Sequence, residues 1–269
     1  MDDRAVIQTE QLTRTFGGSE LPAVDHLDLS VPGGVIFGLL GPNGAGKSTT
    51  IKMLTTLLPP TSGRATVAGF DIVRQASQVR RRIGYVPQLL SADAGLTGRE
   101  NLLLSARLYR VPADERSARL AQALGFMDLV DAADHLVRTY SGGMIRRLEI
   151  AQAMLHEPEV LFLDEPTIGL DPVARRAVWE RLRELKRRSA TTILLTTHDM
   201  EEADALCDTL AIMHQGIIAQ AGAPAALKSA LGADATLEDV FIAVVGGSIE
   251  EGGTYRDVRR ARTTAHRLG

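Results

Sequence analysis

GPNGAGKST, residues 41–49, is the stretch of sequence that decides the fold. It fits the pattern G-x-x-x-x-G-K-[S/T], in which a glycine-rich loop joins a strand to a helix and binds phosphate. The apolar run VIFGLL, residues 35–40, comes directly before it and is typical of a strand buried on both faces of a parallel sheet. A plain glycine turn before a helix is the structural alternative. The preceding strand favours the phosphate site.

Each residue type in this loop has a physical reason to be there. Gly44 and Gly46 allow the backbone to curl so that successive N–H groups face an anion, and the dipole of the following helix adds to the attraction. We expect Lys47 to reach the β- and γ-phosphates of a nucleotide and Ser48 to hold Mg²⁺. The expected nucleotide contacts are Gly41, Pro42, Asn43, Gly44, Ala45, Gly46, Lys47, Ser48 and Thr49.

Further apolar runs predict more strands of the same sheet. They are YVP after Ile83, VLFLD at residues 160–164 and TILLTT at residues 192–197, and polar residues follow the carboxyl end of each. In open α/β sheets, ligands bind beyond the carboxyl ends of the strands. We therefore expect five polar side chains to converge on one ligand, namely Lys47, Gln88, Asp164, Glu165 and His198.

Two carboxylates end the run VLFLDEP, and burying such a pair is costly without compensation. Beside a phosphate loop, Asp164 is placed to act on Mg²⁺, directly or through its water. Glu165 would orient or deprotonate the water that attacks the γ-phosphate. The alternative is two acids at a strand end, one of them capping a loop, and the phosphate loop disfavours it.

Gln88 and His198 are single polar residues that follow strands. The amide of Gln88 can donate and accept, so it is a candidate to touch Mg²⁺ or water and to follow the movement of a neighbouring helical part. The imidazole of His198 is a candidate donor to the γ-phosphate. Alternatively, His198 only packs at a helix start, where Asp199 and Glu202 would form a capping pair.

Three further stretches carry candidate site residues. In RTYSGGMIRRLEIAQ, residues 138–152, a serine and two glycines precede apolar residues at helical spacing. Phe16, in TRTFGG, is a candidate to stack on adenine, although an exposed or core phenylalanine fits the sequence equally. Asp171 and Pro172 fit an N-cap and the first residue of a helix.

The spacing of apolar residues also divides the chain. Alternation at residues 24–31 predicts antiparallel strands, and helical spacing dominates between residues 88 and 156. We therefore expect an α/β fold, in which a core with a mostly parallel sheet carries an N-terminal antiparallel β subdomain and an inserted α-helical subdomain. The expected units are a main domain at 1–222 with its helical part at about 89–157, a short C-terminal extension at 223–245, and a disordered tail at 246–269.

Composition narrows the classes of function. The chain carries a net charge of −3, whereas proteins that bind nucleic acids usually show a basic field, so we expect no nucleic-acid partner. Cys207 is the only cysteine, which excludes an intramolecular disulfide and predicts a buried free thiol. The N-terminus lacks a secretion signal, so we expect a cytoplasmic protein. Because no apolar stretch approaches the ~20 residues that cross a bilayer, a membrane role would need another chain.

Taken in order, these motifs resemble those of an ATPase subunit of an ABC transporter, over about residues 6–222. Residues 41–49 look like the Walker A motif, Gln88 like the Q-loop, 141–144 like the signature, 160–166 like Walker B, 169–172 like the D-loop and His198 like the H-loop. The signature is the most specific, because P-loop enzymes of other families lack it. It reads YSGGM where the family commonly has LSGGQ, so Tyr140 and Met144 depart from the pattern.

The resemblance implies a P-loop NTPase core that uses ATP and Mg²⁺. ATP hydrolysis would depend on Glu165, His198 and Gln88, with Ser48, Gln88 and Asp164 as the metal contacts. In such subunits two chains pair head to tail. The Ser141 motif, with Gly142 and Gly143, would then complete the γ-phosphate site of the other chain, and Asp171 would lie in the D-loop at the dimer contact.

Pairing implies either a homodimer or a partnership with a related ATPase subunit. The resemblance also implies an integral membrane permease that contacts the region near Gln88 and holds the chain on the cytoplasmic face of the membrane. YSGGMIRRLEIA and TLEDVFI, residues 236–242, resemble the daunorubicin-resistance type of exporter ATPase in particular. The transported molecule would touch the permease, so its identity is not written in this chain.

Two other functions are weighed against the exporter. A soluble ABC-type ATPase acting on DNA or ribosomes would predict a long coiled-coil insertion or two cassettes in one chain, and the sequence has neither pattern. A nucleotide switch that hardly hydrolyses is the other alternative. Glu165 and His198 argue against it.

Overall fold

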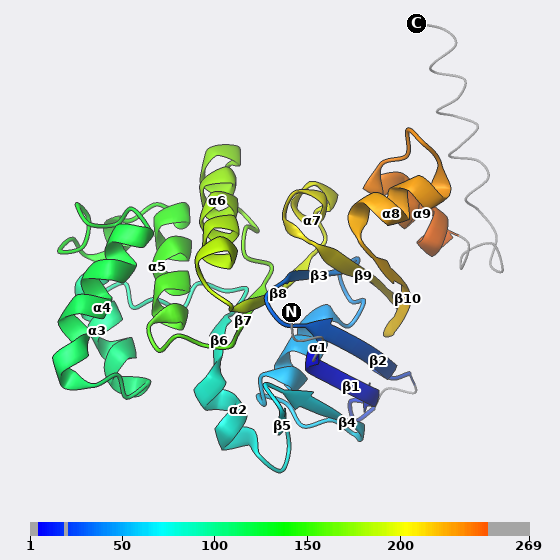
Figure 1. Cartoon of the computed structure of the whole chain (residues 1–269), viewed down its shortest axis with the longest axis horizontal. Coiled ribbons are helices and arrows are strands. Elements are labelled where there is room, and N and C mark those ends of the chain that lie inside the picture. Colours follow the sequence, from blue (N-terminus) through cyan, green and yellow to red (C-terminus); the bar gives the residue numbers. More distant parts are fainter. Residues whose placement is uncertain (1–4, 19–20, 247–269) are drawn as a thin grey trace, which may run out of the picture.

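The computed structural model describes residues 5–18 and 21–246, and two sheets organise this part of the chain (Figure 1). The larger sheet has six strands in the order β10-β9-β3-β8-β7-β6. Adjacent strands of this sheet are parallel, except that β10 runs antiparallel to β9. The prediction of a mostly parallel sheet is thus confirmed. Its strands are β3 (Ile36–Leu40), β6 (Ile83–Val86), β7 (Val160–Asp164), β8 (Thr192–Thr197), β9 (Thr209–His214) and β10 (Ile217–Gly222).

Strand β3 shows why these runs are apolar throughout. Phe37 packs into the core shared with the smaller sheet, whereas Ile36 packs into the core beneath the helices on the opposite face. Between them, Gly38 leaves room for Cys207, because a Cβ at Gly38 would lie 2.5 Å from the Cys207 Sγ. Cys207 is a buried free thiol, as predicted, and burial raises the pKa of this thiol far above its usual range.

The smaller sheet is antiparallel, in the order β2-β1-β4-β5. The alternation that predicted it is visible in β2, where Leu27, Leu29 and Val31 are buried and the residues between them are exposed. This sheet packs on one side of the large sheet, with helix α1 (Lys47–Leu54) contributing Ile51 to the same core. Its strands are β1 (Ala5–Arg14), β2 (Val24–Pro32), β4 (Ser62–Val67) and β5 (Phe70–Asp71), and helix α2 (Ala76–Arg82) leads from it to β6.

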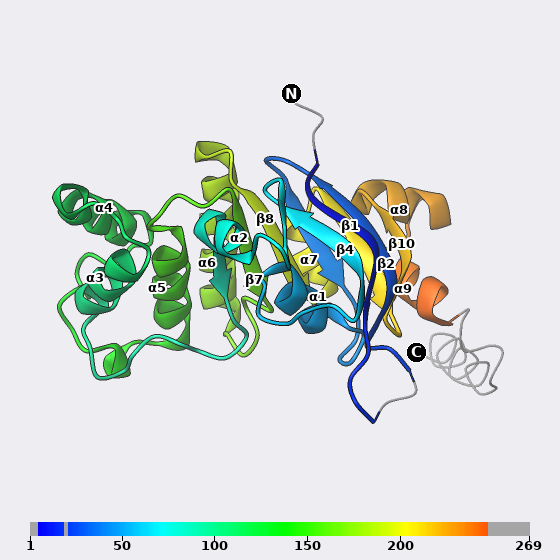
Figure 2. The same cartoon turned by 90° about the horizontal axis from the view of Figure 1, so that it is seen from below.

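A helical part lies between β6 and β7, on the side of the molecule away from the antiparallel sheet (Figure 2). Its first helix begins with a capping box, in which Thr97 and Glu100 exchange hydrogen bonds between side chain and backbone. Residues 87–97 thus form a loop that enters this part. The helices are α3 (Gly98–Leu108), α4 (Ala113–Phe126), the short 3-10 helix η1 (Val137–Thr139) and α5 (Gly142–Met154).

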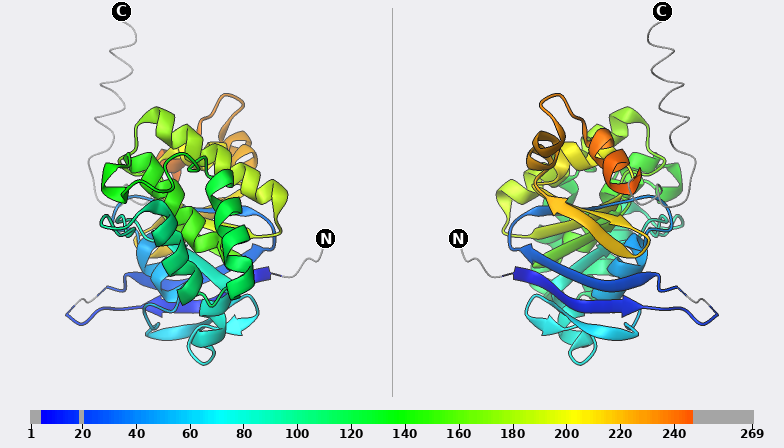
Figure 3. Two further views of the ribbon diagram at one scale, coloured as in Figure 1. Left: turned by 90° about the vertical axis from the view of Figure 1, so that its left-hand side faces the viewer. Right: turned by 90° about the vertical axis from the view of Figure 1, so that its right-hand side faces the viewer.

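Four more helices follow: α6 (Pro172–Arg188), α7 (Met200–Leu206), α8 (Pro224–Leu231) and α9 (Leu237–Gly246). The last two, orange in Figure 3, lie across the large sheet from the blue antiparallel strands and bury Leu227, Leu237 and Val240. Gly246 closes α9, and the rest of the tail predicted at 246–269 lies outside the described residues. None of the helices described is both long and apolar enough to cross a membrane.

Candidate nucleotide site

The glycine-rich loop leaves the carboxyl end of β3 and leads into α1. Gly44 and Gly46 have φ values of +83° and +105°, in the left-handed region that glycine adopts readily. A Cβ on Gly46 would lie 2.4 Å from the carbonyl oxygen of Ala23, and one on Gly41 would lie 2.3 Å from that of Met213. The path of the loop is therefore open only to glycine at these positions.

Replacing Gly46 with alanine is expected to lower the affinity for ATP at least tenfold. The left-handed conformation alone costs roughly 1–2 kcal/mol for a residue with a Cβ, and the clash with Ala23 forces the loop to move. Titration of the variant with a fluorescent ATP analogue measures the change. Gly125→Ala is the control, because nothing lies within 4 Å of its added methyl group, near the end of α4. Unchanged ATP affinity in Gly46→Ala would contradict the assignment of the loop.

Lys47 is the first residue of α1, and its side chain is 4% exposed. Its Nζ donates to the carbonyl oxygens of Gly41, at 2.8 Å, and Pro42, at 3.1 Å, and lies 3.4 Å from Glu165 Oε1. Burial lowers the pKa of this amine, and the neighbouring Glu165 and Asp164 carboxylates oppose that shift. The ammonium group is thus held within the loop that would surround a phosphate.

Ser48 and Asp164 come together next to Lys47. The Ser48 hydroxyl donates to Asp164 Oδ1 at 2.9 Å, and the Thr196 hydroxyl donates to the same oxygen at 2.6 Å. A hydroxyl and a carboxylate are the hard oxygen donors that Mg²⁺ takes when phosphates supply other ligands. No group of three or more His, Cys, Asp and Glu side chains suited to a metal occurs in the described ranges. The Ser48 hydroxyl and the Asp164 carboxylate are two oxygen donors of the kind that an ion shared with a nucleotide takes from the protein.

Glu165 is the centre of the site. Its Oε2 lies 3.2 Å from His198 Nδ1 and accepts from Gln88 Nε2 at 3.5 Å, while Oε1 faces Lys47. Its φ of 50° is unusual for a residue with a Cβ, and Thr196 holds it there, accepting from the Glu165 N–H through its carbonyl and hydroxyl oxygens. Three strand ends thus direct side chains at one buried carboxylate.

His198 follows β8 and is half exposed, with its ring turned to Glu165. A cavity of about 90 Å³ lies beside the pair, lined also by Ile168 and Gly169. The capping role considered for the next residues is partly observed, because Asp199 Oδ1 accepts from the Glu202 N–H at 3.1 Å. The Glu202 carboxylate instead accepts from Thr167 and Trp179 in the core, so it does not complete a capping box.

The serine and glycines at 141–143 lie at the start of α5, away from the loop. Ser141 is the N-cap and its Oγ accepts from the Met144 N–H at 3.3 Å. Gly143 is packed against α6, where an added Cβ would lie 2.7 Å from the Ala174 Cβ. Among the described residues no hydrogen bond or ion pair joins 141–143 to 41–49, and Figures 1 and 2 show β7 and α6 between α5 and α1. The exposed Ser141 and Gly142 face outward.

Asp171 and Phe16 lie at the edges of the site. Asp171 caps α6, accepting from the N–H groups of Val173 and Ala174 at 2.9 Å each, and Pro172 is the first helical residue, as predicted. Phe16 is 42% exposed, and the Arg14 guanidinium lies 4.8 Å from its ring centroid. The ring is therefore an accessible flat surface and not a core residue.

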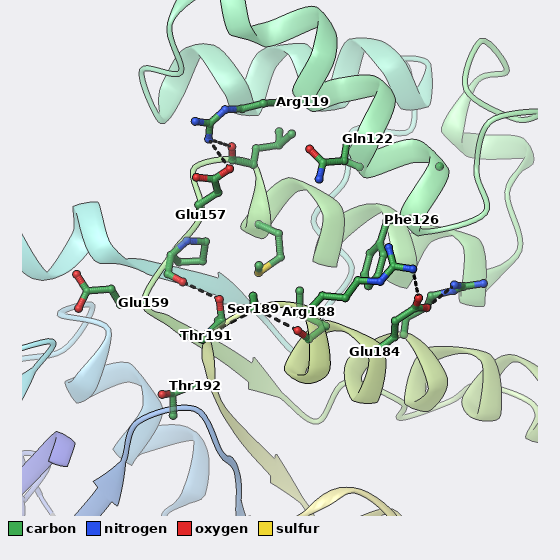
Figure 4. A pocket seen from close by; sticks show the side chains of 18 of the residues that line it. Arg119, Gln122, Phe126, Glu157, Glu159, Glu184, Arg188, Ser189, Thr191 and Thr192 are labelled. Atoms are coloured by element: carbon green, nitrogen blue, oxygen red, sulfur yellow. Dashed lines mark hydrogen bonds and ion pairs between the residues drawn. The ribbon is translucent and has the colours of Figure 1, made fainter. Parts of the chain in front are cut away.

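A second cavity, larger than the one beside Glu165 and His198, is not this site. It has a volume of about 880 Å³ and lies near the starts of β7 and β8, bounded by α4 and α6 (Figure 4). Arg119 and Arg188 point to Glu157 and Glu184 there, so its charges are already paired. None of the motif residues lines it. Cavity volume alone would thus point to a region that holds none of the motif residues.

Comparison with known proteins agrees with the motif geometry. The family model described as ABC transporter matches residues 24–168, which are 145 of the 269 residues and include both glycine motifs and the Asp164–Glu165 pair. The chain belongs to the ABC transporter family. The residues that resemble Walker A, the Q-loop, the signature and Walker B lie within the matched range, whereas those that resemble the D-loop and H-loop, 169–172 and His198, lie beyond it. These labels are kept for the same residues.

Individual relatives of this ABC protein are similar over most of its length. A daunorubicin/doxorubicin resistance ATP-binding protein of Streptomyces peucetius is 48% identical, over 85% of this chain and 68% of its own. A Nod factor export ATP-binding protein I of Paraburkholderia xenovorans is 45% identical, over 86% of this chain and 75% of its own. The resemblance to the daunorubicin-resistance type is thus confirmed.

Solved structures confirm the fold. An ATP-binding subunit of an ABC transporter superposes with a TM-score of 0.78 at 30% identity, covering 89% of this chain and 99% of the other. A dimeric ATP-binding cassette in a post-hydrolysis state, bound to ADP and Pi, gives a TM-score of 0.72 at 25% identity, covering 81% and 98%. This chain therefore has the α/β architecture of ABC ATP-binding domains.

Sequence reasoning missed several residues that support the site. Thr196 holds both Asp164 and Glu165, and its only signal was a polar residue near the end of an apolar strand. Arg146 and Glu149 in the signature helix are buried against the Q-loop, where charges at helical spacing would normally face solvent. Two charged residues three positions apart on the core-facing side of a helix were the available signal.

Proposed function

We propose that this chain is the ATP-binding and hydrolysing subunit of an ABC exporter, with ATP-dependent head-to-tail dimerisation driving a separate membrane permease. The observation that carries the proposal is the buried Glu165 carboxylate, which Lys47, Gln88 and His198 contact together. We further propose that residues 1–222 are the ATPase domain, with 89–157 as its helical subdomain and 223–245 as a short extension.

In this proposal the site residues divide the work of hydrolysis. Residues 41–49 surround the phosphates, Lys47 neutralises charge at the β- and γ-phosphates, and Phe16 stacks on adenine. Ser48 and Asp164, with Gln88, hold Mg²⁺, which supplies charge stabilisation at the phosphates. Glu165 orients the attacking water or accepts its proton, while His198 donates to the γ-phosphate.

The exposed side of the signature supports pairing. Ser141 and Gly142 are exposed within one chain, although they begin a helix whose N–H groups favour an anion. Val173, two residues past Asp171, is an apolar side chain that is 79% exposed. A second ATPase subunit, either another copy or a relative, would cover these groups and bring Ser141, Gly142 and Gly143 to the γ-phosphate held by Lys47. Asp171 would then lie at the contact.

The Q-loop supports a permease partner. Leu89 is 81% exposed and Leu90 is 51% exposed, directly after Gln88. Two exposed leucines in sequence favour a protein contact. The relatives named for daunorubicin/doxorubicin resistance and for Nod factor export support an exporter. The chain would then be peripheral on the cytoplasmic face of the membrane.

Replacing Leu89 with aspartate is expected to reduce the share of the full chain recovered with membranes at least fivefold, because a charge replaces an apolar contact with the permease. Nucleotide affinity should stay unchanged, since Leu89 is exposed to solvent and is not among the expected nucleotide contacts. Quantitative immunoblotting of membrane and supernatant fractions measures the ratio. Leu231→Asp, an exposed leucine in α8, is the control. Equal membrane recovery of both variants and of wild type would count against a permease contact at this loop.

A further inference from the structure

A buried ion pair lies in the signature helix, five and eight residues after Ser141. Arg146 Nη1 is 3.0 Å from Glu149 Oε2, and both side chains are only 2% exposed. Burial lowers the pKa of the guanidinium. Removing two charges from water is costly, and an apolar pair of similar volume would often serve stability as well or better. The cost of burying this pair therefore indicates a role besides stabilising the fold.

Both charged groups reach across to the Q-loop. Arg146 donates to the carbonyl oxygens of Pro87 and Gln88 at 2.8 Å each. Glu149 Oε1 accepts from the Ser91 hydroxyl at 3.1 Å and from the Ser91 and Ala92 N–H groups. The ion pair thus binds the loop on both sides of its exposed tip, which Leu89 and Leu90 form.

The ion pair connects the Q-loop with the start of the signature helix. The Q-loop would act on the nucleotide bound by its own chain, and the signature on the nucleotide bound by the other chain. Gln88 faces Glu165 in its own chain. Ser141 is the N-cap of α5, the helix that carries the pair. A helix is stiff over two turns, so a loop fixed to it at Gln88 and Ser91 moves with Ser141. Leu89 and Leu90, the exposed tip, lie between the residues that Arg146 and Glu149 bind.

We propose that Arg146 and Glu149 are positioning residues that lock the Q-loop to the signature helix, so that the Leu89–Leu90 tip, the Gln88 amide and Ser141 move as one body. The proposal rests on the proposed function, because it assigns Gln88 to hydrolysis. A displacement of the loop tip would then pass along a contiguous path of hydrogen bonds to Gln88 in one half-site and to Ser141 in the other.

The test compares full-length chains by steady-state phosphate release. In the double variant R146M/E149L we expect the affinity for ATP to stay within about twofold and kcat to fall about tenfold or more, because small misplacement of a catalytic group is costly. Adding Gln88→Ala should then lower kcat by less than about twofold, although Gln88→Ala lowers it strongly in wild type, since groups acting as one unit are not additive.

Arg147→Met is the matched control, because Arg147 lies on the same helix but donates to the Met127 and Asp128 carbonyls. Gln88→Ala should keep its full effect there. The proposal is overturned if Gln88→Ala lowers kcat as strongly in R146M/E149L as in wild type. It is also overturned if R146M/E149L itself has the kcat of wild type. If the double variant does not fold, Arg146→Lys allows the same comparison, because an ammonium group cannot donate in the same fork to both carbonyls.

Hydrogen exchange gives a readout that does not depend on catalysis. The amides of Ser91 and Ala92 should exchange faster in R146M/E149L than in wild type and in Arg147→Met. Equal exchange would overturn the lock itself. If instead wild type releases phosphate no faster than Glu165→Gln, the proposed function fails, and the exchange comparison still decides whether the pair holds the loop.

Discussion

Glu165→Gln is expected to lower kcat for ATP hydrolysis by about 10²- to 10⁴-fold, the range for removal of a positioned general base. The amide keeps the size of the side chain and its place among Lys47, Gln88 and His198, so ATP should still bind. What is lost is the group that orients the water and accepts its proton. Phosphate release at saturating Mg-ATP measures the effect.

The same variant should accumulate as a dimer in Mg-ATP, because the γ-phosphate contacts that favour closure persist when hydrolysis stops. Sedimentation velocity with Mg-ATP, and with Mg-ADP for comparison, detects the pair. Glu201→Gln is the control, since Glu201 is an exposed acid in α7. Wild-type phosphate release by Glu165→Gln would remove the catalytic assignment, and a monomer under Mg-ATP would remove the proposed closure.

Mixing two inactive variants is expected to restore hydrolysis. Lys47→Ala should lose phosphate binding at its own loop, and Ser141→Arg should obstruct the site of the opposite chain. A mixed dimer has one site with both defects and one site with neither. Random pairing of equal amounts therefore restores about a quarter of wild-type activity, provided that the dimer is two-fold symmetric.

The control is Lys47→Ala mixed with Glu165→Gln, which share the same half-site. Every mixed dimer then has one site lacking Lys47 and one lacking Glu165, so activity should stay at the background of each variant alone. Phosphate release against mixing ratio separates the two cases. Activity in the control mixture, or none in the first mixture, would contradict a site divided between chains.

Strand positions were predictable because burial on both faces demands continuous apolar runs. The predicted strands at 160–164 and 192–197 agree with β7 and β8 residue for residue. Helices α8 and α9 were predicted only as an extension, because each is short and buries few residues against α7 and the sheet. Their stability comes from packing, which a local pattern does not record.

The candidate site was predictable where strand ends and loop chemistry coincide, as at Lys47, Asp164 and Glu165. The sequence did not reveal that Glu165 adopts a left-handed backbone conformation held by Thr196. Nor did it reveal that Arg146 contacts Pro87 and Gln88, which lie 59 and 58 positions earlier in the chain. Such contacts depend on how the helical part folds back onto the sheet, and spacing along the chain carries little information about that distance.

The sole cysteine, enclosed beside Gly38, makes the native fold nearly inert toward thiol-directed labels. A cysteine engineered at an exposed position outside the proposed site, such as Leu231 in α8, would therefore be the single attachment point for a spectroscopic probe on each subunit. Distances between two such probes would follow opening and closing through the catalytic cycle without background signal. Conversely, modification of Cys207 would report that the centre of the large sheet has come apart.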